Sequence, residues 1–163
     1  MYISRFNSIT KLKHFINIFI FFSYIFSFQA IKGQQLVNHS LQKRPRICNQ
    51  NNNCVLIELA RTERELSLGL MFREKLDKNA GMLFDYGSPK YVNIWMLNTL
   101  IPLDIIFINN GIILKIIEGA QPCTVEPCKL YNSEYPVNKV LEINSGKSKK
   151  MNLKIGQKLF LEI

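Results

Sequence analysis

The pattern of hydrophobic and polar positions divides the chain into an apolar leader, a polar stretch and a longer region of short apolar runs. Beyond residue 53, these runs are separated by turn residues and predict about seven strands: Val55–Ala60, Gly81–Tyr86, Tyr91–Met96, Leu103–Asn109, Ile112–Glu118, Lys139–Asn144 and Lys158–Ile163. Most connections are short enough for antiparallel pairing. The sequence therefore predicts a mainly β (α+β) domain, either a small antiparallel barrel or two packed sheets, with one covering helix.

That helix is predicted between the first two strands. Thr62 and Glu65 have the spacing of a capping box, in which each side chain binds an otherwise unpaired backbone N–H of the first turn. The pattern predicts a helix from Glu63 to about Phe72. Arg73 would then follow at the helix end, where a cation favours the exposed carbonyl groups.

Residues 1–33 have the pattern of a signal peptide. Residues 1–13 are basic, without an acidic residue, and residues 15–28 are predominantly apolar. A membrane-spanning helix needs about 20 apolar residues, and this run is shorter, so we expect cleavage near Gly33. The alternative is an uncleaved membrane anchor. A polar linker at 34–53 would lead into a single β-rich domain at 54–163, exported to a periplasmic, lumenal or extracellular location.

The leader also carries part of the basic charge. Removing residues 1–33 takes away four of the 21 basic residues and none of the 12 acidic ones, which lowers the net charge from +9 to +5. Five of the remaining lysines form a cluster near the C-terminus, at positions 147, 149, 150, 154 and 158. No aromatic residue is interleaved before Phe160, so we interpret this cluster as a solvated surface and expect no nucleic-acid partner.

The four cysteines predict two disulfides. An even number of cysteines in a small exported domain is typical of a disulfide framework. The short spacings favour the local pairs Cys48 with Cys54 and Cys123 with Cys128. A zinc site made of cysteines alone is the competing interpretation, but its usual spacings are tighter.

Several familiar chemistries lack their residues in the predicted domain. The two histidines, His14 and His39, precede residue 54, so a Ser-His or Cys-His nucleophile has no base and metal sites lose their commonest ligand. Phosphate-binding and dinucleotide-binding glycine motifs are also missing from the sequence. We therefore expect no metal and no cofactor. Carboxylates remain, and two of them facing one cleft could hydrolyse a glycoside; the candidates are Asp85, Asp104, Glu118 and Glu142.

A series of motifs resembles the family called domain of unknown function 192. The order and spacing agree from about Val55 to Ile163, through these segments: Gly69–Arg73, Gly81–Phe84, Trp95–Ile108, Pro122–Cys128, Tyr131, Val140–Glu142 and Gly146. One departure is Leu97, where the family usually has a lysine. The resemblance implies a compact, largely β fold that is often exported in bacteria. It implies no established activity and supplies no catalytic residues.

The polar positions around the only tryptophan form the predicted ligand site, which comprises Arg73, Trp95, Asn98, Thr99 and Asp104. Asp104 precedes four apolar residues, so its carboxylate must lie at the rim of the core or be paired there. The competing interpretation is structural. Asp104 would then accept hydrogen bonds from the Asn98–Thr99 turn or pair with Arg73, and Trp95 would be a core or half-buried residue.

Three functions fit these observations. We favour an exported, non-enzymatic module that binds a small ligand or an envelope protein, with membrane contact only through an uncleaved signal segment. The second is a cell-envelope hydrolase that uses Asp104 with another carboxylate. The third is a structural or assembly factor without a pocket. A covered and fully bonded Asp104 would count against the hydrolase.

Overall fold

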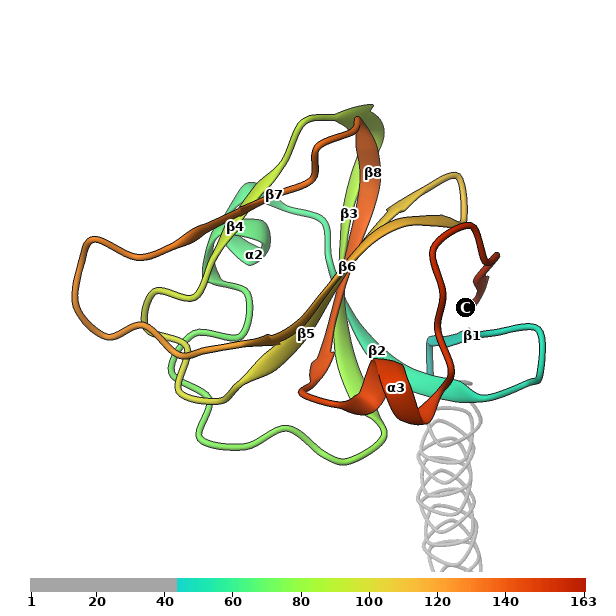
Figure 1. Cartoon of the computed structure of the whole chain (residues 1–163), viewed down its shortest axis with the longest axis horizontal. Helices are drawn as coiled ribbons and strands as arrows, with labels where there is room; N and C mark the ends of the chain where they lie inside the picture. The colour runs from blue at the N-terminus through green and yellow to red at the C-terminus, as the bar shows by residue number, and fades with distance from the viewer. Residues whose placement is uncertain (1–43) are drawn as a thin grey trace, which may run out of the picture. The chain divides into compact units, whose positions relative to one another are not determined.

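The structure, a computed structural model, describes residues 44–163, and the predicted signal peptide lies outside the described residues. The described part folds as one unit with two short helices and nine strands (Figure 1). All seven predicted strands are present, and the mainly β class is confirmed. The strands are β1 (Arg46–Cys48), β2 (Cys54–Ala60), β3 (Ala80–Lys90), β4 (Asn93–Trp95), β5 (Leu103–Asn109), β6 (Ile112–Ala120), β7 (Leu130–Asn132), β8 (Val137–Asn144) and β9 (Phe160–Glu162).

Two short strands were not anticipated by the pattern of apolar residues. β1 lies within residues 34–53, which the sequence indicated as linker, whereas the compact unit begins at Arg44. β1 pairs with both β2 and β9, so its extended conformation comes from its neighbours and not from its own apolar pattern. β7 likewise pairs with β4 in a separate two-stranded sheet.

The main sheet has seven strands in the order β6-β5-β8-β3-β2-β1-β9. Its pairs are antiparallel except for β2 and β3, which run parallel because α2 (Glu63–Leu68) connects them. At the two edges of the sheet, Ile112 and Lys158 form an isolated bridge, and the Leu159 N–H donates to the Gly111 carbonyl over 2.7 Å. The sheet is thus curled into a half-barrel.

α2 begins as predicted and ends earlier. Both hydrogen bonds of the Thr62–Glu65 capping box are present. The helix stops at Leu68 because Gly69 adopts a positive φ of 48° and donates its N–H to the Glu65 carbonyl. A Cβ at Gly69 would lie 3.0 Å from the Phe84 ring, so glycine also lets the chain pass close to β3. The sequence had placed Arg73 at the helix end, but Arg73 lies beyond it.

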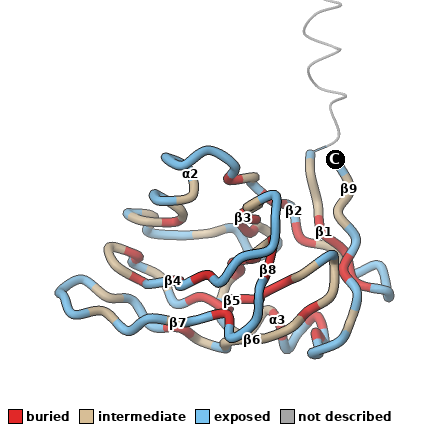
Figure 2. Tube along the Cα trace, turned by 90° about the horizontal axis from the view of Figure 1, so that it is seen from above, coloured by how far each residue is buried: buried red, intermediate tan, exposed pale blue. Residues whose placement is uncertain are grey.

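The sheet separates two hydrophobic cores, and buried residues concentrate on its central strands (Figure 2). One core contains Val140 of β8 and packs toward α2 and the β4–β7 sheet. The other contains Leu141 and Ile143 and packs toward the segment of α3 (Lys147–Lys150) and the C-terminal residues. Since successive side chains of a strand alternate between faces, neighbouring residues of β5 and β8 serve different cores.

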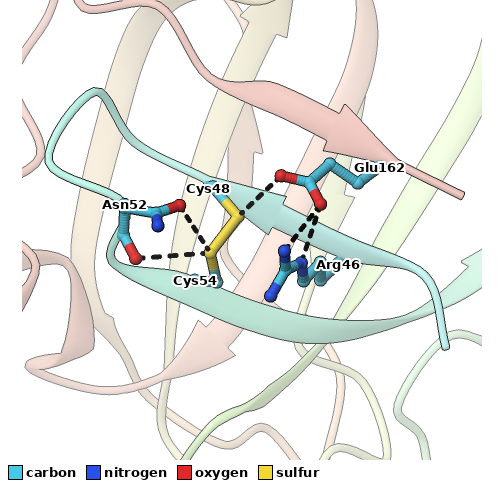
Figure 3. Close-up of polar contacts among 5 residues, drawn as sticks. All are labelled: Arg46, Cys48, Asn52, Cys54 and Glu162. Carbon is cyan, nitrogen blue, oxygen red and sulfur yellow. Dashed lines mark hydrogen bonds and ion pairs between the residues drawn. A yellow bond between two sulfur atoms is a disulfide. The ribbon is translucent and has the colours of Figure 1, made fainter. Parts of the chain in front are cut away.

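Both predicted cysteine pairs are at bonding distance, with S–S separations of 2.05 Å for Cys48–Cys54 and 2.08 Å for Cys123–Cys128. The first pair joins β1 to β2, as Figure 3 shows. Beside it, the Arg46 guanidinium pairs with the Glu162 carboxylate at 2.8 Å and ties β1 to β9. These bridges are compatible with an oxidising, exported location. Within residues 44–163, no helix is both long and apolar enough to cross a membrane.

Candidate ligand-binding pocket

Asp104 is fully buried, and its carboxylate is held by donors on the α3 side of the sheet. Oδ1 accepts hydrogen bonds from the N–H groups of Gly119 and Gly146, at 2.9 and 3.1 Å. Oδ2 accepts from the N–H and the hydroxyl of Ser148, at 2.9 and 2.6 Å. The sequence had suggested the Asn98–Thr99 turn or Arg73 as the partner of Asp104, and that prediction was wrong. Asp104 therefore fastens β6 and the start of α3 to β5.

Arg73 and Asn98 also hold the chain in place. The Arg73 guanidinium donates two hydrogen bonds of 2.6 Å to the Glu58 carboxylate on β2, and this pairing lowers the pKa of Glu58. Asn98 has a left-handed backbone with φ of 55°. Its N–H donates to the Cys123 carbonyl and its carbonyl accepts from the Phe72 N–H, each over 2.8 Å. Neither side chain lines the pocket described next.

Trp95 and Thr99 line a pocket of about 240 Å³. Its other walls come from α2 and the chain that follows it, the middle of β3, β4 and β8. Two further aromatic side chains of its wall, Phe84 and Tyr86, come from β3. Trp95 is 45% exposed, so it is not packed in the core, and part of the residue is accessible. Of the five predicted ligand residues, the structure thus brings two together at one pocket.

Glu142 is the carboxyl group in this pocket. Its cross-strand neighbours are Met82 on β3 and Ile105 on β5, and its side chain is only 5% exposed. No residue in the described part of the chain makes a hydrogen bond or ion pair to its carboxyl group. Burial raises the pKa of Glu142 to about 8, so at neutral pH the group is mainly a protonated acid that can donate a hydrogen bond.

Tyr86 shares the pocket wall with Glu142. Burial, together with the nearby Glu142 carboxyl, raises the pKa of Tyr86 to about 12, which keeps the phenol neutral. The ammonium group of Lys90 lies 4.5 Å from the centroid of the Tyr86 ring. Lys90 itself is exposed and does not line the pocket. Glu142 is consequently the only wall residue whose charge changes near neutral pH.

The sequence contained a weak signal for Glu142 that pattern reading could not resolve. Glu142 was one of four candidate carboxylates, and it interrupts the apolar run of Val140, Leu141 and Ile143. Strand periodicity predicts that the side chains of Glu142 and Leu141 lie on opposite faces of the sheet, but it does not predict which face contains a pocket. Gly81 adds to the close packing here, since a Cβ on it would lie 2.6 Å from the Glu142 carbonyl oxygen.

A second hollow, of about 590 Å³, lies over β2 and the start of β3. Its charged lining residues are all exposed, and they carry both signs: Arg44, Glu58, Asp77 and Lys78. It therefore offers no buried group that lacks a partner. In the part of the chain that the structure describes, no cluster of three or more His, Cys, Asp or Glu residues is arranged to hold a metal ion.

The fold and the pocket together define a small β domain with one buried carboxyl among aromatic side chains. This chain belongs to the family DUF192, described as an uncharacterized ACR, which matches residues 46–161. No curated protein is significantly similar to it.

Two crystal structures resemble the chain. One is a candidate transcription regulator from Sinorhizobium meliloti 1021, with a TM-score of 0.65 and 35% sequence identity over 72% of this chain and 92% of that protein. The other is a protein of unknown function from Novosphingobium aromaticivorans DSM 12444, with a TM-score of 0.64 and 34% identity over 71% of this chain and 82% of that protein. Both are consistent with the family and the β-rich fold.

Proposed function

We propose that this protein is an exported binding module that holds a small ligand in the pocket of Trp95, Thr99 and Glu142. The observation that carries the proposal is the buried Glu142 carboxyl, which has no hydrogen-bond partner among residues 44–163. Because Glu142 lines the pocket, a ligand there could form the hydrogen bond or ion pair that the protein does not supply.

The pocket wall has the mixture expected of a small-molecule site. Such sites combine apolar and aromatic surface with a few polar groups that fix orientation. Here Phe84, Tyr86 and Trp95 supply the aromatic surface, while Glu142 and Thr99 are among the polar residues of the wall. A volume of about 240 Å³ suits a molecule smaller than a typical drug.

A glycoside hydrolase has less support from this geometry. Hydrolysis by paired carboxylates needs two of them about 5–10 Å apart across one cleft. Glu142 is the one carboxyl group that lines the pocket, and Asp104 lies on the other face of the sheet with its oxygens fully engaged. The binding module therefore remains the better account.

A protein partner is the second candidate, because apolar side chains are exposed next to the pocket. Leu68 and Trp95 line it and are 48% and 45% exposed. Leu130 pairs with Trp95 across the β4–β7 sheet and is 57% exposed. Exposed apolar surface of this kind often marks an interaction site. An envelope protein could thus present a side chain to the pocket and cover this rim.

The test is a fragment screen on the full chain, purified with its disulfides intact from an export compartment. Small cationic, neutral and anionic fragments are screened by amide NMR and by fluorescence of Trp95, the only tryptophan. We expect hits that shift the amides of Thr99 and Glu142. Glu142→Leu, which removes the carboxyl group, should weaken them by about tenfold, as expected for losing one hydrogen bond.

The matched control is Arg73→Gln, which changes a residue outside the pocket and should leave binding unchanged. If no fragment of any charge class perturbs Thr99, Trp95 or Glu142 at millimolar concentration, the small-ligand function is rejected. Co-purification of an envelope protein that is lost in Leu130→Ser would instead favour the second candidate.

A further inference from the structure

We infer that the ligand of this pocket is a small organic cation, such as an alkylammonium or quaternary ammonium compound, paired with Glu142 among the aromatic rings. This inference rests on the proposed function and specifies the ligand class. It is distinct from the family assignment, which implies no ligand.

The charges of the pocket wall argue against an anionic ligand. No lysine, arginine or histidine is among the lining residues, so nothing there would neutralise a phosphate or carboxylate. Glu142 is the one ionisable acid with a usual pKa below neutrality, and its negative form repels anions. A cation would instead be attracted, because it would supply the partner that the buried carboxyl lacks.

The aromatic residues favour a cation for a separate reason. The faces of Trp, Tyr and Phe rings carry negative potential and attract ammonium groups within about 6 Å of the ring centroid. Tyr86 already shows this behaviour, since the Lys90 ammonium group lies 4.5 Å from its centroid. Phe84 and Trp95 add two more rings to the same pocket. Cages of aromatic rings recur in the recognition of quaternary ammonium ligands.

Cation binding should displace the proton from Glu142. The groups packed around this carboxyl are apolar on both neighbouring strands, at Met82 and Ile105. The titratable groups on this face are Tyr86, whose raised pKa of about 12 keeps it neutral, and Lys90, which lies over the Tyr86 ring. One strand further on, Glu58 is opposite Met82 and is paired with Arg73, which lowers the pKa of Glu58 and keeps it ionised. A proton released on binding near pH 7 therefore comes from Glu142. A neutral ligand would bind the protonated acid and release none.

The experiment compares cations with neutral molecules of the same shape on the intact chain. Choline is paired with 3,3-dimethyl-1-butanol, and isobutylamine with isobutanol, in calorimetric titrations using two buffers of different ionisation enthalpy. We expect each cation to bind about tenfold or more tightly than its neutral counterpart. We also expect close to one proton released per cation at pH 7, falling toward zero by pH 9.

Two variants sharpen the result. Glu142→Gln should remove both the preference for cations and the proton release. Lys90→Gln removes a positive charge beside Tyr86 and should raise cation affinity a few-fold, whereas it would lower the affinity of an anion.

Equal or tighter binding of the neutral molecules overturns the cation inference while the binding function stands. Cation binding without proton release, or binding that survives Glu142→Gln unchanged, also overturns it. If these probes fail but other fragments shift Thr99 and Glu142, the ligand class is wrong and the pocket function is retained. If the full fragment screen also fails, both proposals are rejected.

Discussion

The carboxyl groups of Asp104 and Glu142 lie on opposite faces of one sheet, although their strands are hydrogen-bonded neighbours. In the β5–β8 register, Asp104 is opposite Ile143 and Glu142 is opposite Ile105. Ile143 belongs to the core on the α3 side, and Ile105 to the core on the α2 side. The two acids thus have separate roles: Asp104 is fully bonded by the protein, and Glu142 faces the pocket without a protein partner.

Asp104→Asn should destabilise the fold by about 3 kcal/mol, because the new amide group would point a donor at backbone N–H groups in a buried site. Chemical denaturation gives the free energy of unfolding. Ser148→Ala removes only the 2.6 Å hydroxyl bond and should cost about 1–2 kcal/mol. Fragment affinity per folded molecule should be unchanged in both variants. A marked loss of affinity with normal stability would return Asp104 to the ligand site.

The stability of the protein should depend on pH through Glu142. Its pKa is raised from 4.5 to about 8 in the folded state, so the folded protein binds the proton more tightly than the unfolded chain. The stabilisation that comes from this tighter proton binding is fully present below about pH 4.5 and is lost as pH rises through about 8. Relative to the parent, Glu142→Gln should gain stability on the order of 5 kcal/mol as the pH rises from the lower to the upper limit. If the free energies of unfolding of the parent and the variant differed by the same amount at every pH in this range, the prediction would be wrong.

Gly81→Ala should cost about 2–3 kcal/mol, because its Cβ would overlap the Glu142 carbonyl oxygen at 2.6 Å and the Ile143 side chain at 2.8 Å. Gly87→Ala is the matched control. Its Cβ would meet nothing within 4 Å, so only the positive φ of 75° matters, at about 1 kcal/mol. Thermal unfolding of the two variants separates the effect of the close contact at Gly81 from the effect of backbone strain at Gly87. Equal losses of stability would mean that β3 and β8 can move apart easily to make room for the new Cβ.

Arg73→Gln should change the free energy of unfolding by about 1 kcal/mol or less, because the Arg73–Glu58 pair lies at the surface. The effect should shrink further at high salt. A loss of several kcal/mol would show that the pair is shielded from water in solution.

The double variant Cys48→Ser and Cys54→Ser should cost about 2 kcal/mol and loosen the β1–β9 edge first. Hydrogen exchange should rise at Ile47 and Leu161, which are register partners across that edge. Exchange at Thr99 and Glu142 should stay at the parental level. Faster exchange throughout the domain would contradict this local effect.

The sequence predicted most of the strands, because their alternation and turns are local properties of the chain. It did not predict β1, which is short, follows a basic segment and depends on pairing with β9 at the other end of the chain. It also placed the helix end at Phe72, since the helical pattern of Leu66 and Leu70 continues past the positive-φ turn at Gly69.

The candidate site was predicted only in part for a similar reason. Trp95 and Thr99 were found from an unusual local motif, and both line the pocket. Asp104 belonged to the same motif but points to the other face, and Glu142 joins the pocket from a strand far along the chain. A pocket depends on which face of each strand meets which neighbour. A single sequence does not specify that arrangement.

The most direct test of the central claim is an NMR titration of the Glu142 carboxyl carbon in the intact, ligand-free protein, repeated with saturating choline. We predict a midpoint near 8 without ligand, reflecting a buried carboxyl without a protein partner, and a lower midpoint when choline is bound. A ligand-free midpoint near 4.5 that choline leaves unchanged would contradict the account, because Glu142 would then be an ordinary solvated acid.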